Sequence, residues 1–185
     1  MKKIITAIAI TAAFSACMSP GNKVGVDNRS AKNQEIMRKF YEEVMNKHNT
    51  AMVDSLVASD YVEHCIDPGY TPDRNGLRKG WEDFIKGYPD LNCKINFMVA
   101  DTDCVTVQYT ITGTNTGSVM GMAATGKKIN VDGVDIVRFK NGKAFEHWGY
   151  MDEMKMMAQL GMSPGMGGGT DTTKAKMLDG DSKKM

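Results

Sequence analysis

The spacing of apolar residues changes near the middle of the chain, from a helical repeat to strict alternation. In the first half, apolar positions recur every three or four residues, which predicts three helices. The three groups are Ile36, Met37, Phe40, Tyr41, Val44 and Met45; Val53, Leu56 and Val57; and Leu77, Trp81, Phe84, Ile85 and Tyr88. Pro89 cannot continue a helix, so the third helix is expected to end before it.

The second half alternates apolar and polar residues, which predicts strands. Four segments show this pattern, namely 95–99, 105–111, 128–139 and 144–151. Between the last two, Asn141-Gly142 is a strong signal for a β-hairpin. A last helix is expected over residues 153–160. Helices followed by antiparallel strands predict an α+β fold, with a curved sheet packed on N-terminal helices as a cone with an open mouth.

The predicted hairpin sets a register between its two strands. If the turn has two residues, Lys140 pairs with Lys143. Counting back from that pair puts Asp135 opposite Trp148. A carboxyl group that faces an indole loses solvation, which raises its pKa and suits an acid catalyst or a neutral hydrogen-bond donor. The alternative is a structural aspartate.

Directly opposed residues share a face of a sheet, so this register also sorts the neighbouring side chains. It places Asp135, Trp148 and Asp152 on one face, and Arg138 and His147 on the other. Both faces are partly apolar. We therefore expect one face to line a pocket and the other to meet a second copy of the chain, which predicts a homodimer through the sheet.

The N-terminus has the features of a bacterial export signal. Lys2 and Lys3 precede an apolar run over residues 4–14 that is too short to span a bilayer. Small residues before Cys17 resemble a lipobox, so residues 1–17 are interpreted as a lipoprotein signal peptide with the lipid on Cys17. The mature chain would then be exported and anchored at the bacterial cell envelope. The alternative is an ordinary signal peptide with an incidental cysteine.

Polar segments flank the periodic part of the chain. Residues 18–32 have no periodicity and predict a flexible tether, and residues 33–161 form the predicted domain. Residues 162–185 are rich in glycine, threonine, aspartate and lysine, which predicts a disordered tail. The 23 basic and 22 acidic residues form no basic stripe, so we expect no nucleic-acid partner.

The remaining cysteines lack the spacing of metal ligands. We interpret Cys65, Cys93 and Cys104 as free, buried apolar residues, with a Cys93–Cys104 disulfide as the alternative. No metal site is expected.

A series of short motifs follows in a characteristic order. It comprises Gly113-Thr114-Asn115-Thr116-Gly117, Thr125-Gly126-Lys127-Lys128, Val137-Arg138-Phe139, Glu146-His147-Trp148-Gly149 with Asp152, and Gln159-Leu160-Gly161. Together they resemble the SnoaL-like polyketide cyclase family, also called the ester cyclase group. The resemblance implies a nuclear transport factor 2-like cone, dimeric through its sheet. It also implies ring closure without a cofactor, with an aspartate as acid or base, and that role falls on Asp152.

A more distant resemblance is to ketosteroid isomerase, which shares the cone. Val62-Glu63-His64 is similar to the segment that carries its general base, and residues 135–139 are similar to its Asp-x-x-Arg-Phe strand. Tyr41 falls near its first-helix tyrosine. The resemblance implies an oxyanion hole made by Tyr41 and Asp135 opposite a base at His64. Imidazole replaces the carboxylate base there, and it still accepts a proton near neutral pH.

These observations combine into one candidate site. The catalytic candidates are His64, Asp135 and Asp152, and the substrate-binding candidates are Tyr41, Trp81 and Trp148. Such a set suits removal of a proton next to a carbonyl group of a small hydrophobic molecule, without a metal or cofactor. The second hypothesis is a non-catalytic ligand-binding lipoprotein of the envelope. The predicted anchor favours it, because polyketide assembly is cytoplasmic.

Overall fold

The computed structural model describes residues 27–119 and 121–162. The helices are α1 (Arg29–Lys39), η1 (Phe40–Asn46), η2 (Thr50–Met52), α2 (Val53–Leu56), α3 (Arg74–Gly87) and α4 (Glu153–Leu160). The strands are β1 (Val57–Glu63), β2 (Asn92–Ala100), β3 (Cys104–Thr114), β4 (Lys128–Lys140) and β5 (Lys143–Met151). The predicted signal peptide with Cys17 and the tail after Met162 lie outside the described residues.

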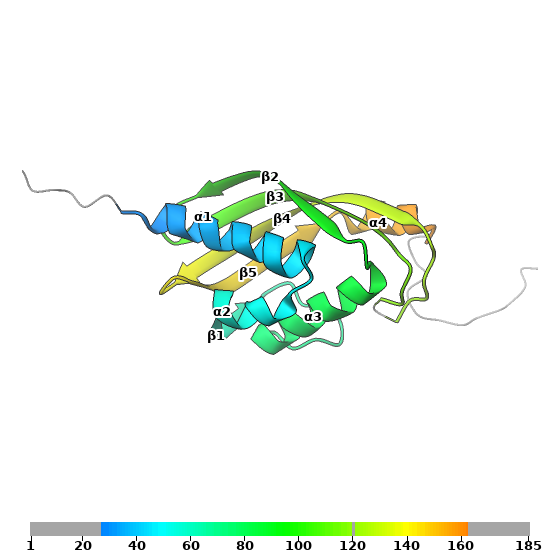
Figure 1. Ribbon diagram of the computed structural model, residues 1–185, viewed down its shortest axis with the longest axis horizontal. Helices are drawn as coiled ribbons and strands as arrows, with labels where there is room; N and C mark the ends of the chain where they lie inside the picture. The colour runs from blue at the N-terminus through cyan, green and yellow to red at the C-terminus, as the bar shows by residue number, and fades with distance from the viewer. Residues whose placement is uncertain (1–26, 120, 163–185) are drawn as a thin grey trace, which may run out of the picture.

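The five strands form one sheet in the order β1-β5-β4-β3-β2. The four strands predicted from alternation pair antiparallel, and β1 adds an edge strand parallel to β5. α1 crosses one face of the curved sheet, and α4 lies at its far end against β4 (Figure 1). The predicted α+β class, with a curved sheet packed on N-terminal helices, is confirmed.

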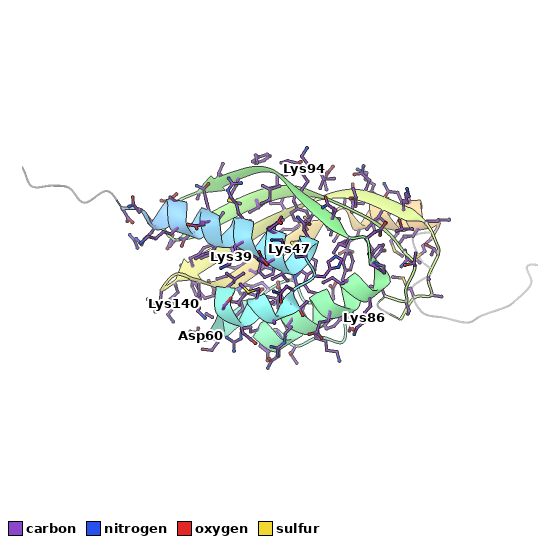
Figure 2. All side chains as sticks on the ribbon, viewed as in Figure 1. Lys39, Lys47, Asp60, Lys86, Lys94 and Lys140 are labelled. Carbon is purple, nitrogen blue, oxygen red and sulfur yellow. The ribbon has the colours of Figure 1, made fainter. Side chains whose placement is uncertain are left out.

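The covered face of the sheet holds the apolar core. Along β3 every second residue is buried, including Val105, Val107, Tyr109 and Ile111, as alternation predicts for a sheet with one covered face. The first helical stripe supplies Tyr41 and its buried neighbours. Charged side chains lie around the outside, where Figure 2 labels Lys140 near Asp60, and their side chains form an ion pair at 3.0 Å.

The β4–β5 hairpin turns where the sequence predicts. Lys140 pairs with Lys143, and both Asn141 and Gly142 have positive φ, which is the backbone of a type I′ turn. The pairing then shifts, because Phe139 pairs with Ala144 but Arg138 pairs with Glu146. One extra residue in β5, Phe145, therefore forms a β-bulge.

The bulge reverses the faces of all the following side chains in β5. Asp135 lies opposite Gly149, Val137 opposite His147, and Ile136 opposite Trp148. The predicted pairing of Asp135 with Trp148 is therefore wrong. His147 shares the covered face with Asp135, and Trp148 lies on the other face, because a shift of one residue exchanges the two faces of a strand.

The three described cysteines are all free, so the alternative of a disulfide is wrong. Cys93 lies opposite Ile111 and Cys104 opposite Arg138, at the two ends of β3. Within residues 27–119 and 121–162, no helix has the length and apolar composition needed to cross a bilayer.

Candidate functional site

Five polar side chains form a continuous hydrogen-bonded chain on the covered face of the sheet. The Tyr41 hydroxyl donates to Asp135 Oδ2 at 2.5 Å, and His147 Nε2 lies 3.1 Å from Asp135 Oδ1. On the other side of the ring, His147 Nδ1 lies 2.7 Å from Glu63 Oε2, which also accepts from the Tyr61 hydroxyl at 2.6 Å. We call Tyr41, Tyr61, Glu63, Asp135 and His147 the inner cluster.

Three separate features of the fold bring the inner cluster together. The bulge in β5 turns His147 toward the face that Asp135 occupies. The parallel pairing of β1 with β5 places Glu63 beside His147. Tyr41 comes from the π-helical segment η1, a distortion that is frequent at functional sites.

Gly149 makes room for the contact between His147 and Asp135. A Cβ atom at this position would lie 2.8 Å from His147 Cε1 and 3.4 Å from Asp135 Oδ1. The first distance is shorter than real Cβ contacts allow, so any larger residue would displace the imidazole. The glycine therefore lets the ring lie between its two carboxylates.

The charged members of the inner cluster are enclosed but not sealed. The exposed fraction of the side chain is 14% for Asp135, 20% for His147 and 12% for Glu63. The two tyrosines are almost fully buried. A water-sized group can therefore reach the carboxylates and the imidazole, while the surroundings keep the local dielectric constant low.

Opposing effects act on the protonation of His147. Burial alone would lower its pKa, but hydrogen bonds and charge attraction from Asp135 and Glu63 outweigh burial and raise the pKa to about 10. The side chain is therefore an imidazolium near neutral pH, and both ring nitrogens donate. Burial would raise the pKa of Glu63, but the hydrogen bond from His147 and the one from Tyr61 leave it lowered.

The tyrosines of the inner cluster remain neutral donors. Burial is the main cause that raises the pKa of Tyr41, and the charge of Asp135 adds to it. Burial and the charge of Glu63 act in the same way on Tyr61. Chemically, the inner cluster thus offers carboxylates that can accept a proton and three groups that can donate hydrogen bonds.

The structure separates His64 and Trp148 from the inner cluster. The two rings stack on each other, with centroids 4.2 Å apart and planes 4° apart, and Trp148 lies on the face opposite to Asp135. His64 Nε2 is 3.7 Å from Glu146, another residue whose side chain lies on that face. The predicted contact between Asp135 and an indole is therefore replaced by contacts with Tyr41 and His147.

The remaining candidates also lie apart from Asp135. Asp152 is exposed and caps α4, where its carboxylate accepts from the backbone N–H of Lys155 at 3.0 Å. Trp81 lies on α3 and packs edge-on against Phe40 and Phe84. Of the six sequence candidates, the structure brings two pairs into direct contact, Tyr41 with Asp135 in the inner cluster and His64 with Trp148 on the other face.

Tyr61, Glu63 and His147 are site residues that were not predicted from the sequence. Tyr61 and Glu63 lie two residues apart, so a strand predicted over this segment would have placed both side chains on one face. His147 had no comparable signal, because its face depends on the bulge.

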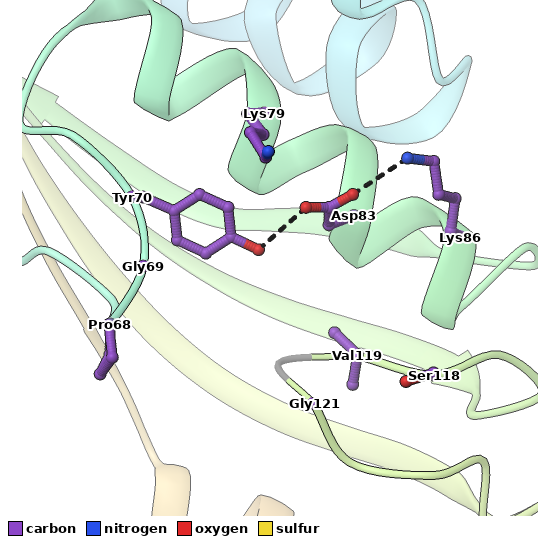
Figure 3. Close-up of a pocket in the computed structure, with 9 residues that line it drawn as sticks. All are labelled: Pro68, Gly69, Tyr70, Lys79, Asp83, Lys86, Ser118, Val119 and Gly121. Carbon is purple, nitrogen blue, oxygen red and sulfur yellow. Dashed lines mark hydrogen bonds and ion pairs between the residues drawn. The ribbon is translucent and has the colours of Figure 1, made fainter.

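Two cavities lie near the surface of the described residues. One, of about 340 Å³, lies between α3 and two loops (Figure 3). Beside it the Tyr70 hydroxyl donates to Asp83 at 3.2 Å, and Lys86 pairs with the same carboxylate at 3.0 Å. The other, of about 510 Å³, lies near Gly113 and Lys128. Neither is lined by the inner cluster or by Trp148. No group of side chains in the described ranges could hold a metal ion.

The fold and its covered polar site define a nuclear transport factor 2-like α+β cone. Residues 35–160 match the family model described as SnoaL-like polyketide cyclase. This match covers more than half of the chain, so the chain belongs to the SnoaL-like polyketide cyclase family. Membership of this family indicates that the chain is a protein with a pocket for a small molecule. A search of curated proteins finds no match.

Solved structures share the fold. TsrD from Streptomyces laurentii is 24% identical with a TM-score of 0.65, over 71% of this chain and 96% of that one. IdmH from Streptomyces antibioticus, a putative polyketide cyclase, is 26% identical with a TM-score of 0.61, over 70% and 99%. A putative polyketide cyclase from Acidithiobacillus ferrooxidans is 27% identical with a TM-score of 0.61, over 70% and 94%.

Proposed function

We propose that the inner cluster catalyses proton transfer on a small hydrophobic carbonyl compound, without a cofactor, as in a cyclase, isomerase or hydrolase. The observation that carries the proposal is the partly exposed Asp135 carboxylate, held between the Tyr41 hydroxyl and the His147 imidazolium. A carboxylate in an enclosed site, close to donors, is an arrangement that suits enolisation. Similarity to proteins described as polyketide cyclases agrees with this class of chemistry.

In the proposed step, Asp135 accepts the proton from the carbon next to the carbonyl group. The C–H electron pair moves to form the enolate, and its negative charge collects on the oxygen. Protonation of Asp135 removes its charge, so the Nε2–H of His147 becomes free to donate to that oxygen. Return of the proton from Asp135 to another carbon completes an isomerisation. In a ring closure the enolate carbon attacks a second carbonyl group, and Asp135 returns the proton to the alkoxide oxygen that forms.

The first experiment follows exchange of the protons next to the carbonyl group of β-tetralone in deuterated water by NMR. The wild-type chain is expected to accelerate exchange, and D135N should lose at least about 100-fold of that acceleration. Asp132 lies in the same strand but is exposed and pairs with Lys155, so D132N is the matched control. Equal rates in D135N and D132N would refute the role of Asp135.

The same assay tests the roles predicted for His64 and Asp152. Their positions outside the inner cluster favour a small effect of H64A and D152N, of less than about threefold. A loss as large as that of D135N would transfer the base to the residue concerned.

A second candidate function is a non-catalytic binding protein of the envelope. The apolar run over residues 4–14, followed by small residues and Cys17, favours it. In this case β-tetralone would raise the Tm of the chain but exchange no faster than in buffer. Mass spectrometry of the exported chain tests the anchor itself, because C17A should abolish the mass of the attached acyl groups.

For the assembly, we propose a homodimer through the outer face of the sheet. Cross-strand pairing aligns two rows on this face, Phe97, Gln108, Val134 and Tyr150 and then Val99, Thr106, Ile136 and Trp148. Phe97, Val99 and Tyr150 are exposed, which is unusual for large apolar side chains in adjacent rows. Light scattering should give a dimer mass for the wild type and a monomer mass for Y150K. A monomeric wild type at about 50 μM would contradict the proposal.

A further inference from the structure

We propose that the inner cluster selects uncharged ligands over anions, and that Glu63 is the residue that sets this selectivity. The inference names the ligand class of the proposed site, and it rests on the proposed function only in assigning the ligand to the inner cluster. Its basis is the number and positions of the charges that face the covered side of the sheet.

The charged side chains of the inner cluster do not balance. Glu63 and Asp135 contribute two carboxylates and His147 contributes one imidazolium, so the formal charge is −1. Both nitrogens of the imidazolium are already engaged, one by each carboxylate. An anionic ligand would therefore find no free cation among these groups.

Within residues 27–119 and 121–162, the groups that act on the cluster from the surrounding elements are neutral or acidic. Helix η1 contributes the phenol of Tyr41, and β3 contributes that of Tyr109, whose pKa is raised by burial and by Asp135. From β2, burial and the charge of Asp135 raise the pKa of the Cys93 thiol, which stays neutral. From β1, Tyr61 is a neutral donor.

The loop after β1 adds a further negative group. Burial raises the pKa of Asp67, and the carboxylates of Glu153 and Glu63 raise it further. Asp67 and Glu63 therefore repel each other when both are ionised. The basic residues of β4 that follow Asp135 form ion pairs outside the inner cluster. Arg138 pairs with Glu146 at 3.1 Å, and Lys140 pairs with Asp60 at 3.0 Å.

Enclosure of the inner cluster strengthens the effect of its unbalanced negative charge on a ligand. The carboxylates of the inner cluster are between 12% and 14% exposed, so water screens them far less than it screens surface charges. A carboxylate or phosphate placed beside Asp135 would have to approach an unbalanced charge and lose its own hydration. A ketone, ester or amide loses less hydration free energy because it is neutral, and its oxygen can accept hydrogen bonds from the donors of the cluster.

Glu63 is the position where the charge can be changed with the least change in shape. In E63Q the amide oxygen can still accept from Tyr61 and His147, and the formal charge of the cluster rises from −1 to zero. The amide nitrogen replaces the oxygen that accepts from the backbone N–H of Cys65 at 3.1 Å, so that one hydrogen bond is lost. Glu146 is a natural match, since it also lies beside a histidine and on the same sheet, but on the outer face. E146Q therefore removes one carboxylate without changing the inner cluster.

The test measures dissociation constants of β-naphthamide and β-naphthoate for the full chain by equilibrium dialysis near neutral pH. These probes have the same rings and nearly the same shape, and they differ in charge. Wild type and E146Q are expected to bind the amide at least about tenfold more tightly than the carboxylate. E63Q should reduce that ratio by about tenfold, mainly through tighter binding of the carboxylate.

Equal affinities of the wild type for the two probes would overturn the inference, and so would equal ratios in E63Q and E146Q. If E63Q does not fold, as judged by circular dichroism, D135N supplies the same change of charge from the other side of His147. The exchange assay separates this result from the proposed function. Exchange that persists without the charge preference refutes only the inference, whereas the preference without exchange refutes only the catalysis.

Discussion

Each face of the sheet carries a histidine beside a glutamate, and the two pairs differ in burial and in geometry. On the inner face, His147 lies 2.7 Å from Glu63 and 3.1 Å from Asp135, with its side chain 20% exposed. On the outer face, His64 lies 3.7 Å from Glu146, is 34% exposed and stacks on Trp148. Enclosure and a second carboxylate make the inner pair strongly coupled. The outer pair is an ordinary surface contact of small energetic consequence.

The largest expected effect is on stability when the inner histidine is removed. H147A leaves Glu63 and Asp135 as enclosed carboxylates without a cation between them, which should lower the free energy of unfolding by about 3 to 5 kcal/mol. H64A should cost less than about 1 kcal/mol because its contact is solvent-screened. Urea unfolding near neutral pH measures both. Equal losses would show that the two faces do not differ in coupling.

The next effect concerns pH. The pKa of His147 is about 10 in the folded state and about 6.5 in an unfolded chain, so its stabilising contribution is complete below about pH 6.5. As the pH rises toward 10, the unfolded state loses its proton first and the contribution disappears. The free energy of unfolding should therefore fall by roughly 1 kcal/mol per pH unit in this range.

The matched variants H147Q and H64Q isolate that pH effect. H64Q should keep the wild-type slope between about pH 7 and 9, and H147Q should lack most of it. Lysines and tyrosines elsewhere titrate equally in both variants. A slope that survives in H147Q would show that another group is responsible.

A smaller effect is expected from the glycine beside the imidazole. G149A introduces a Cβ that would lie 2.8 Å from His147 Cε1, so the ring must move away from Asp135. We expect a loss of about 1 to 3 kcal/mol and a lower pKa of His147 by NMR. G142A has open space but a positive φ, so it controls for the loss of a glycine alone. An unchanged His147 titration in G149A would contradict the proposed role of the glycine.

The smallest effect compares two buried phenols. The Tyr41 hydroxyl donates to Asp135, whereas the fully buried hydroxyl of Tyr88 has no hydrogen-bond partner among the described residues. Y41F should therefore cost about 1 to 2 kcal/mol, and Y88F should be neutral or stabilise by up to about 1 kcal/mol. Calorimetry measures both. A clear loss in Y88F would indicate a partner for that hydroxyl, such as an ordered water or a ligand.

Much of the architecture can be predicted from the sequence because it depends on local patterns. The helical repeat through Tyr41 and the alternation along β3 each mark one buried face. Asn141-Gly142 predicts the hairpin because both residues tolerate positive φ. Tyr41 and Asp135 were identified correctly as neighbours by resemblance to ketosteroid isomerase.

The tertiary structure decided which side chains accompany them. One extra residue, Phe145, exchanges the faces of His147 and Trp148, and the pattern of β5 does not reveal the shift because both of its faces are partly apolar. Glu63 reaches His147 through a parallel pairing between strands that are distant in the sequence. The sequence by itself indicated the main helices, the four antiparallel strands, the turn and the family, but not the edge strand β1. Long-range pairing decided the site, because register is set by contacts between strands and not within them.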